Sequence, residues 1–431
     1  MGRKKIIVAW VCEFSNPLVR GNLTFRSLAF ENFVRSQMKK PAKIMADYDQ
    51  WITNGIEEMK KFENLELHVV SFHKYIKNDV YEFENECVHY HILKPEDDCR
   101  FLNNVFRKFL KKEDDKEFKR NRKTIKQTLA AINPDIIHYY GAENPEYSIS
   151  ALDIDSSKTP LIVNLQTLMS APGFKENYPL PGDSYEFRSG IEKKVIRNAT
   201  FIGTSSTVYK DIILQNIKPD AVFIKMSLMI AERINVIKCE KKYDFVYFSA
   251  DISKAADLAI EAFIITSGER KGTTLCVIGD YMPEFKAKLE KRLAEHNLVD
   301  NVTFTGRLAT HDDVLEGVRK ARFALLPLKV DLVSGTIREA MASGLPVVTT
   351  KTAGTPSLNQ NRESVLVSEI GDNKALSDNM LKLLDDDAFA KKLAENALVT
   401  YKEKYDNSSR AADLMKIYEA IYNKDYKSVI W

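Results

Sequence analysis

The sequence contains little of what marks a secreted, disulfide-rich or membrane-spanning protein. It has 5 cysteines in 431 residues, and none of them forms a CxxC pair. This usage predicts free thiols in a reducing compartment rather than a disulfide framework. The apolar start, IIVAWVCEF, is too short to span a membrane and is not followed by the small-residue cleavage site of a signal peptide. We therefore expect a cytoplasmic protein whose first buried strand is this run.

The sequence also lacks an excess of charge and a dinucleotide-binding fingerprint. Its 63 basic residues nearly balance 60 acidic ones, for a net charge of +3. This balance gives no electrostatic reason to expect a nucleic-acid partner, and we predict none. No GxGxxG opens a strand–helix unit, so a Rossmann dehydrogenase fits poorly. The length and a hydrophobic content of 44% predict a globular chain of two or three domains.

Apolar runs alternate with helical patterns along nearly the whole chain. Examples are LELHVVSF, DIIHYYG and LIVNLQTL in the first half and FVYFSA, TLCVIGD and FALLPL in the second. Such runs, separated by helices, are typical of parallel strands buried on both faces. The pattern restarts near Lys241–Asp244. We therefore predict an α/β protein with doubly wound domains at 1–238 and 239–407 that face a central cleft, and a terminal helix at 408–431.

The segment Phe323–Thr350, FALLPLKVDLVSGTIREAMASGLPVVTT, carries the most informative motif. It reads as a buried strand, a polar loop, a short helix and a second buried strand. A helix that begins after a strand is an anion site, because its first amides lack intrahelical partners and the helix dipole is positive there. Asp331 and Glu339 flank that helix start. The pattern favours a ligand with phosphate and hydroxyl groups, such as a nucleotide-sugar. The alternative is an ordinary capping box of Thr336 and Glu339.

Three other patterns have simpler interpretations. His89 and His91 share one face of a predicted strand and could ligate a metal, but with no further Cys or His placed beside them an ordinary strand is the better interpretation. Asp153 and Asp155 are interpreted as surface carboxylates, so no metal is predicted. The basic, amphipathic stretch at 101–132 either packs its apolar stripe on a sheet, which its interspersed acids favour, or lies on an anionic membrane surface. A peripheral membrane contact on the cytoplasmic face therefore stays open.

The second half resembles glycosyltransferase family 4, the retaining nucleotide-sugar enzymes of GT-B fold. Three stretches carry the resemblance in order: SKAADLAIEAF, LCVIGDYMPEFKAKLEKRLAEHNLVDNVTFTGRL and DLVSGTIREAMASGLPVVTTKTAGTPSL. It is strong from about Phe245 to Asp372 and weaker in the first half. The resemblance implies the GT-B fold, with two Rossmann-like domains and a last helix that packs back on the first domain.

The resemblance also implies roles for residues of the second half. Glu339 would hold the ribose hydroxyls of the nucleotide, and Asp331 would reach the transferred sugar or its phosphate as a catalytic group. Lys254 would neutralise the diphosphate. The amides that receive the diphosphate would be those at the start of the helix, Ser334, Gly335 and Thr336. The nucleotide and its base would lie near Gly279, Arg307 and Leu308.

In the first half the resemblance implies acceptor-side residues. His138, in DIIHYYG, would lie near the sugar as a second catalytic candidate, and Gln166 would lie there too. Glu143 and Asn144, in GAENPEY, could orient an acceptor hydroxyl. A lone histidine on a strand is also commonly a packed residue, and for His138 the two readings are equally balanced.

The sequence departs from the family pattern at two positions. Asp331 stands where the family usually has a glutamate, and Phe248–Asp251 stands where an arginine is expected. Arg20 or Arg338 could replace that arginine. The leading hypothesis is a metal-independent, retaining hexosyl- or hexosaminyltransferase without a cofactor. It would use a nucleotide-sugar donor and a glycan or lipid-linked acceptor in cell-surface polysaccharide biosynthesis. The alternatives are a GT-B protein that binds a nucleotide-sugar or supports a partner without catalysis, and a GT-B epimerase.

Overall fold

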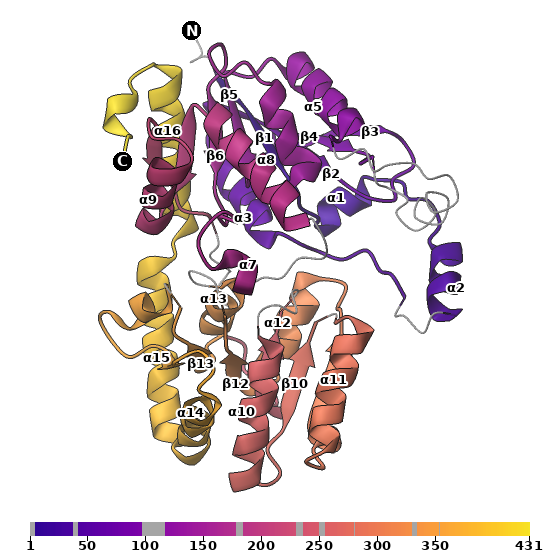
Figure 1. Ribbon diagram of the computed structural model, residues 1–431, viewed down its shortest axis with the longest axis vertical. Helices are drawn as coiled ribbons and strands as arrows, with labels where there is room; N and C mark the ends of the chain where they lie inside the picture. Colours follow the sequence, from indigo (N-terminus) through magenta and orange to yellow (C-terminus); the bar gives the residue numbers. More distant parts are fainter. Residues whose placement is uncertain are drawn as a thin grey trace. The chain divides into compact units, whose positions relative to one another are not determined.

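The computed structural model describes residues 5–37, 42–96, 117–177, 184–229, 236–249, 255–279, 281–329, 334–352 and 354–431. The chain forms two compact units (Figure 1). Unit 1 comprises Met1–Lys43, Asp47–Met229 and Asn407–Trp431, and unit 2 comprises Ile44–Ala46 and Ile230–Asp406. Each unit contains one sheet with helices packed on it, which is the arrangement of a doubly wound α/β domain.

The sheet of unit 1 has eight strands in the order β3-β4-β2-β1-β5-β6-β7-β8. All neighbours are parallel except β3, which runs antiparallel to β4. The strands are β1 (Ile6–Cys12), β2 (Leu65–Phe72), β3 (Val80–Asn85), β4 (Val88–Leu93), β5 (Ile136–Tyr140), β6 (Leu161–Asn164), β7 (Phe201–Thr204) and β8 (Phe223–Lys225).

The helices of unit 1 cover both faces of this sheet, except the helix at Ala29–Gln37, which buries none of its residues. They are α1 (Pro17–Gly21), α2 (Ala29–Gln37), α3 (Gln50–Met59), α5 (Lys119–Ile132), α6 (Pro145–Ser148), η1 (Ile149–Asp153), α7 (Phe174–Asn177), α8 (Ser184–Asn198), α9 (Thr207–Asn216), α16 (Asn407–Tyr422) and η5 (Tyr426–Ser428). Trp10 of β1 packs with α3 and α16, whereas the next residue, Val11, packs with α5, α8 and α9. Successive residues of a strand point to opposite faces, so an unbroken apolar run fits a sheet covered on both sides.

Helix α5 contains the described part of the basic stretch at 101–132. Its Ile125 and Leu129 are buried against the sheet, so these residues pack as the apolar stripe of a surface helix. Residues 101–116 of that stretch lie outside the described part of the chain. Among the described residues, no helix is long and apolar enough to cross a membrane.

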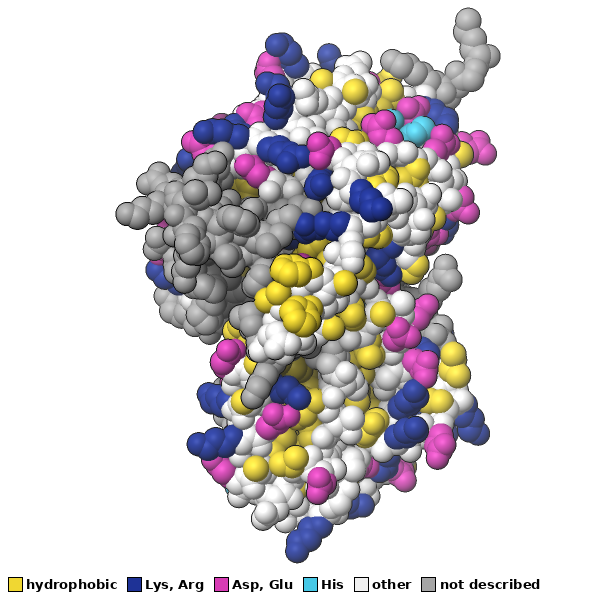
Figure 2. All heavy atoms as spheres, turned by 90° about the vertical axis from the view of Figure 1, so that its right-hand side faces the viewer, with side chains coloured by type: hydrophobic (Ala, Val, Ile, Leu, Met, Phe, Trp, Pro, Cys, Tyr) yellow, Lys and Arg dark blue, Asp and Glu magenta, His cyan; other side chains and the backbone are white. Residues whose placement is uncertain are grey.

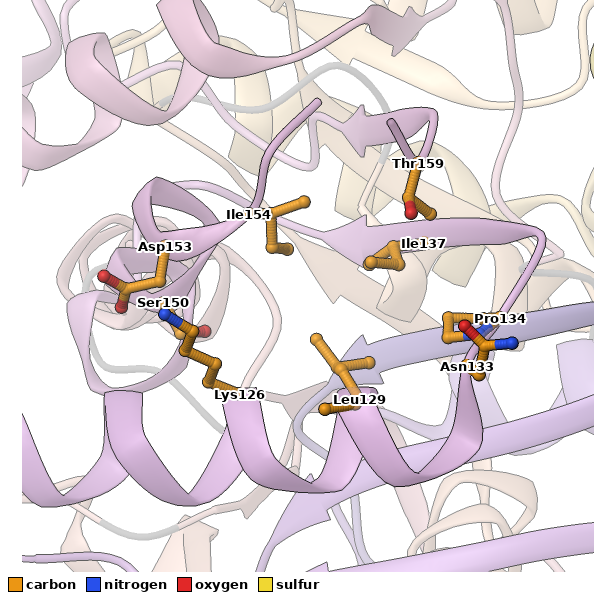
Figure 3. Close-up of a pocket in the computed structure, with 10 residues that line it drawn as sticks. Lys126, Leu129, Asn133, Pro134, Ile137, Ser150, Asp153, Ile154 and Thr159 are labelled. Carbon is orange, nitrogen blue, oxygen red and sulfur yellow. The ribbon is translucent and has the colours of Figure 1, made fainter. Parts of the chain in front are cut away.

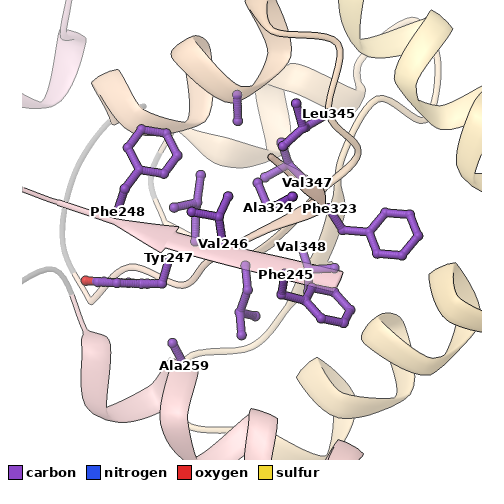
Figure 4. Close-up of a cluster of buried hydrophobic side chains, with 14 of the residues drawn as sticks. Phe245, Val246, Tyr247, Phe248, Ala259, Phe323, Ala324, Leu345, Val347 and Val348 are labelled. Carbon is purple, nitrogen blue, oxygen red and sulfur yellow. The ribbon is translucent and has the colours of Figure 1, made fainter. Parts of the chain in front are cut away.

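The sheet of unit 2 has six parallel strands in the order β11-β10-β9-β12-β13-β14. They are β9 (Tyr243–Phe248), β10 (Leu275–Ile278), β11 (Val302–Gly306), β12 (Ala321–Leu326), β13 (Val347–Thr350) and β14 (Leu366–Ser368). The helices are α10 (Ala256–Glu269), α11 (Pro283–Ala294), η3 (Val299–Asn301), α12 (His311–Arg319), α13 (Gly335–Ala342), η4 (Thr355–Asn359), α14 (Asn373–Asp385) and α15 (Asp387–Lys404). Side chains of β9 lie among buried residues of β12, β13 and α10 (Figure 4).

The units divide at places that differ slightly from the predicted boundaries. The main part of unit 2 begins at Ile230, nine residues before the predicted start of the second domain at 239. The connecting segment is tied to unit 2, because Cys239 Sγ and Lys241 Nζ both donate to the carbonyl of Arg319. The terminal helix α16 belongs to unit 1 and begins at Asn407.

Candidate functional site

The start of α13 lies after β12, at the carboxyl edge of the unit 2 sheet. Its N-cap residue is Ser334, and the Ser334 side chain makes no capping hydrogen bond to the helix. Instead, Ser334 Oγ lies 2.9 Å from Thr336 Oγ1. Thr336 is inside the helix, so the alternative of a Thr336–Glu339 capping box is wrong. The N-cap side chain does not occupy the first-turn amides, which suits an acceptor from outside the helix.

Glu339 and Gly335 together shape the space beside that helix start. Glu339 is half-buried on α13, and its Oε1 lies 3.6 Å from the position that a Cβ on Gly335 would take. The carboxylate therefore turns back toward the first turn of the helix. The missing side chain at Gly335 keeps the approach between the first amides and this carboxylate open.

The loop between β12 and α13 is fastened to the neighbouring strand at its beginning. Leu328 N donates to Thr350 Oγ1 at 2.7 Å, and Thr350 Oγ1 donates to the Leu328 carbonyl at 2.5 Å. Thr349 Oγ1 donates to the Leu326 carbonyl at 2.7 Å. Both threonines are fully buried at the end of β13. The role of these threonines was not predicted. Two hydroxyl side chains at the end of the apolar run PVVTT were the sequence signal that could have indicated it.

A cation that the sequence analysis missed lies on the same loop. Lys329 Nζ forms an ion pair with Asp257 Oδ2 at 2.8 Å, which joins the loop to the first turn of α10. Of the two predicted replacements for the missing arginine, only Arg338 lies near the start of α13, with its Nη2 3.6 Å from the position that a Cβ on Gly335 would take. Arg20 pairs with Asp47 in unit 1, and Arg338 is buried with its guanidinium 5.7 Å from the Tyr405 ring centroid. Lys254 and Asp331 lie outside the described residues.

The turns after β9, β10 and β11 lie at the same edge of the sheet. Gly279, with φ at +148°, follows β10, and a Cβ there would stand 2.2 Å from the Ser249 carbonyl oxygen. Its amide donates to the Gly306 carbonyl at 3.2 Å. Only glycine permits this close packing of three turns. Beyond it, Arg307 is exposed and Leu308 is half-buried against the core. The predicted donor-side residues that are described thus all follow carboxyl ends of strands in one sheet.

In unit 1 a polar cluster follows the adjacent strands β1, β5 and β6. Asn144 Nδ2 donates to Glu13 Oε2 at 2.7 Å, and Asn144 also caps α6 by accepting from Glu146 N. Gln166 Nε2 donates to the Tyr140 carbonyl at 3.3 Å. The structure therefore brings Glu143, Asn144 and Gln166 to one edge of the sheet. Glu13 was not predicted, although a carboxylate near the end of the first apolar run, IIVAWVCEF, was a usable signal.

Two carboxyl groups of this cluster titrate near neutrality. Burial raises the pKa of Glu13 to about 7, with a further contribution from Glu146 and opposition from Lys74. Burial likewise raises the pKa of Glu143 to about 7, although Glu143 accepts a hydrogen bond from Ala142 N at 2.8 Å. Such groups can either donate to or accept from a hydroxyl at pH 7, which is the property that acid–base roles require.

His138 is a core residue rather than a site residue. It is 0% exposed and lies in the middle of β5, two residues before the strand ends. Its Nδ1 is 2.6 Å from Tyr418 Oη, and its ring stacks on Tyr140 with centroids 4.1 Å apart. Burial lowers its pKa to about 3. The prediction of a catalytic His138 is therefore wrong, because β5 extends beyond it and its side chain points under α16.

A pocket of about 180 Å³ also opens in unit 1, but away from these residues. It lies between α5, η1 and the segment that leads into β5 (Figure 3), where Leu129, Ile137 and Ile154 face it. Its Asp153 is held by Arg122 through two hydrogen bonds of 2.5 and 2.7 Å. Because Asn133 and Pro134 precede β5, this pocket is at the amino end of the strand. It is not part of the candidate site.

Comparison with known proteins finds a family match in the part of the chain that carries α13. Residues 243–386 match the family Glycosyl transferases group 1. Over 165 residues the chain is 28% identical to N-acetyl-alpha-D-glucosaminyl L-malate synthase of Bacillus anthracis, a match that spans 38% of this chain and 40% of that protein. Over 377 residues it is 22% identical to an uncharacterized glycosyltransferase of Methanocaldococcus jannaschii, covering 86% of this chain and 94% of that protein.

A solved structure extends the likeness in fold to nearly the whole chain. Anabaena HepE, crystallised in complex with UDP, superposes with a TM-score of 0.62 at 13% identity and covers 96% of this chain and 100% of that chain. The fold is GT-B. The match to the group 1 family and the glycosyltransferase names of the two relatives support a transferase.

Proposed function

We propose that the protein is a retaining glycosyltransferase that moves a hexosyl or hexosaminyl group from a nucleotide-sugar to a glycan or lipid-linked acceptor. The observation that carries this proposal is the start of α13, where the N-cap side chain leaves the first-turn amides and Glu339 turns back toward them. This helix lies within the matched group 1 domain. The UDP in the Anabaena complex and the N-acetyl-glucosaminyl product of the Bacillus relative support the ligand class.

Departure of the sugar builds negative charge on the leaving diphosphate. Amides at a helix start and a nearby cation stabilise charge where it develops, which is commonly the largest single term in such catalysis. We assign the diphosphate to the α13 amides, its neutralisation to Lys254, and the ribose to Glu339. Asp331 is assigned to the transferred sugar. Lys329 holds the β12–α13 loop against α10 and keeps a positive charge on that loop.

The acceptor is assigned to the polar cluster of unit 1. Glu13 and Glu143 can accept or donate a proton near pH 7, and both lie at the edge that Asn144 and Gln166 share. Carboxylates and amides of this kind orient sugar hydroxyls. We place the reaction in the cytoplasm, in the synthesis of cell-surface polysaccharide, without a divalent cation in the transfer step.

The test is to incubate the purified protein with a panel of nucleotide-sugars and acceptors and to measure the release of nucleoside diphosphate. Glu339→Gln should lose donor binding, measured by titration calorimetry with the free nucleoside diphosphate, by at least roughly tenfold, about 1.4 kcal/mol. Glu363→Gln is the matched control. Glu363 is an exposed glutamate that follows η4 and is not part of α13. Equal affinities in the two variants would remove Glu339 from the donor site.

A second candidate is a GT-B protein that binds a nucleotide-sugar without transferring it. The chain favours it at one point, since Phe248–Asp251 provides no arginine for the diphosphate. Donor binding without diphosphate release across the acceptor panel would support this candidate. Interconversion of the donor sugar in the absence of any acceptor would instead indicate an epimerase.

A further inference from the structure

Three histidines and three glutamates form a ladder on one face of the unit 1 sheet. Their strands are adjacent in the order β3-β4-β2, with β3 at the edge of the sheet. His68 of β2 is the register partner of His89 on β4. On the other side, Glu84 and Glu82 of β3 are opposite His89 and His91. His68 therefore lies beside His89 and His91, a neighbour that the sequence alone could not place because it does not fix strand register.

The side chains of this ladder contact one another closely. His68 Nε2 lies 3.2 Å from Glu66 Oε1, and His68 Nδ1 lies 3.0 Å from His91 Nε2. His91 Nδ1 is 3.0 Å from Glu82 Oε1. The rings of His68 and His89 stack with centroids 4.5 Å apart. One ligand atom each from Glu66, His68 and His89 can be chosen so that all lie within 4.8 Å of one another.

Three contacts link Glu66, His68, His91 and Glu82 in a row, and they lack one hydrogen-bond donor. Three contacts in a row need three N–H groups, whereas two neutral imidazole rings carry only two. A cation between Glu66 and His68 Nε2 removes the shortage. His68 Nδ1–H then donates to His91 Nε2, and His91 Nδ1–H donates to Glu82. A metal-bound histidine commonly donates its other N–H to such a partner, which fixes the ring.

No lysine or arginine competes for this position in the described ranges. Within them, the ion pairs of Glu66, Glu82 and Glu84 are made with histidines alone. The side chains of Glu66 and His89 are each 35% exposed, so an ion can enter from solvent. Histidine side chains bordered by acidic ones are visible on the surface in Figure 2.

We propose that Glu66, His68 and His89 bind one divalent transition-metal ion of the zinc class. In a tetrahedral zinc site, ligand bonds of about 2.0–2.1 Å hold ligand atoms roughly 3.4 Å apart, and the Glu66–His68 separation already matches. Two imidazoles with one carboxylate suit zinc, cobalt or nickel rather than calcium or magnesium, which prefer oxygen ligands alone. The fourth position is open to water.

This site is separate from the proposed transfer reaction. Glu66, His68 and His89 belong to the first halves of β2 and β4, whereas the acceptor cluster follows the last residues of β1, β5 and β6. A metal here joins β4 to β2 and thereby holds the β3–β4 edge of the sheet. Because a ligand that binds only the folded state stabilises it by mass action, the ion should raise the stability of unit 1.

The test uses the full chain without a purification tag, stripped with a chelator and titrated with Zn²⁺ and, for its absorption spectrum, Co²⁺. We expect one ion per chain, a cobalt spectrum typical of nitrogen and oxygen ligands, and no competition from Mg²⁺. His68→Gln and His89→Gln should each weaken binding at least roughly tenfold. His296→Gln, which removes an exposed histidine of unit 2, is the control and should change nothing.

A second readout keeps the proposal testable if a variant is destabilised. All 3 tryptophans, Trp10, Trp51 and Trp431, belong to unit 1, so a fluorescence melt follows this unit alone. Zn²⁺ should raise the midpoint of the wild-type melt and leave that of His89→Gln unchanged. Absence of binding at about 1 mM Zn²⁺ would overturn the proposal. The missing donor would then be a proton shared within the row of histidines and glutamates. Equal loss of affinity in His296→Gln would reduce it to unspecific binding by surface histidines.

Discussion

The hydroxyl of Tyr418 lies 2.6 Å from Nδ1 of His138 in the core of unit 1, a contact that spans 280 residues of sequence. Trp10 Nε1 donates to the same hydroxyl at 2.8 Å. Because the tryptophan supplies a proton to the oxygen, the hydroxyl hydrogen is left to donate to His138. Tyr418 thus joins the last helix, α16, to the two central strands β1 and β5. The terminal segment is an integral part of this core.

We predict that Tyr418→Phe destabilises unit 1 by about 2–6 kcal/mol. The substitution keeps the ring but leaves Trp10 Nε1–H and His138 Nδ1 buried without that partner, and each loss of this kind costs about 1–3 kcal/mol. Urea unfolding followed by tryptophan fluorescence measures it, since the tryptophans all belong to unit 1. Tyr422→Phe on the same helix is the control, because Tyr422 is only partly buried there. Equal midpoints for the two variants would contradict the prediction.

We predict that acidification weakens unit 1 through His138. Its pKa is lowered by burial to about 3 from a usual value near 6.5. The unfolded chain therefore takes up a proton below pH 6.5 that the folded core refuses, so stability falls as the pH drops from 6.5 toward 3. At about 1.36 kcal/mol per pH unit, the contribution lost by pH 5 is about 2 kcal/mol.

The comparison that isolates this effect is His138→Gln, which cannot take up the proton. Its free energy of unfolding, measured by fluorescence in urea, should lie below that of wild type at pH 7 and approach it at pH 5. A constant difference between the two proteins across this range would show that His138 is protonated in the folded core.

The fold was largely predictable because its signal is local and repeated. Runs such as IIVAWVCEF and FALLPL are buried on both faces in β1 and β12, and an unbroken apolar run reports that burial directly. The antiparallel edge strand β3 gave a weaker signal, since its exposed and half-buried residues alternate and it holds two glutamates. Such a strand depends on its neighbour rather than on its own composition.

The site was predictable only where one segment carries it. The helix start at Ser334–Glu339 is contiguous, so its motif is visible in the sequence. His138 was wrongly placed at the edge of the sheet. A side chain reaches that edge only if the strand ends beside it, whereas β5 continues to Tyr140. His68 and His91 are 23 residues apart in the sequence. Their contact depends on the register between two strands, which no local sequence pattern encodes.

We predict that Gly335→Ala weakens nucleotide binding without unfolding the protein. An added Cβ would lie 3.6 Å from Glu339 Oε1 and from Arg338 Nη2, an ordinary contact that the fold tolerates. The methyl group would nevertheless fill the approach to the first-turn amides, and we expect a loss of at least roughly tenfold in affinity for the nucleoside diphosphate by calorimetry. Gly268→Ala, where nothing lies within 4 Å, is the matched helical control. An unchanged affinity in Gly335→Ala would place the ligand away from α13.

We predict that the Glu143 carboxyl has the opposite pH dependence to His138. Its pKa is raised by burial to about 7 from a usual value near 4.5. The folded state therefore keeps a proton that the unfolded chain loses above pH 4.5, so this contribution to stability declines as the pH rises through 7. Glu143→Gln cannot ionise. Between pH 5 and pH 8 its free energy of unfolding should therefore rise by about 1–3 kcal/mol relative to that of wild type, a range reduced for the partial exposure of Glu143. Exposed Glu363→Gln should show no such gain. The measurement is fluorescence-detected urea unfolding at both pH values, and parallel pH profiles for wild type and Glu143→Gln would mean that Glu143 is already ionised in the folded cluster.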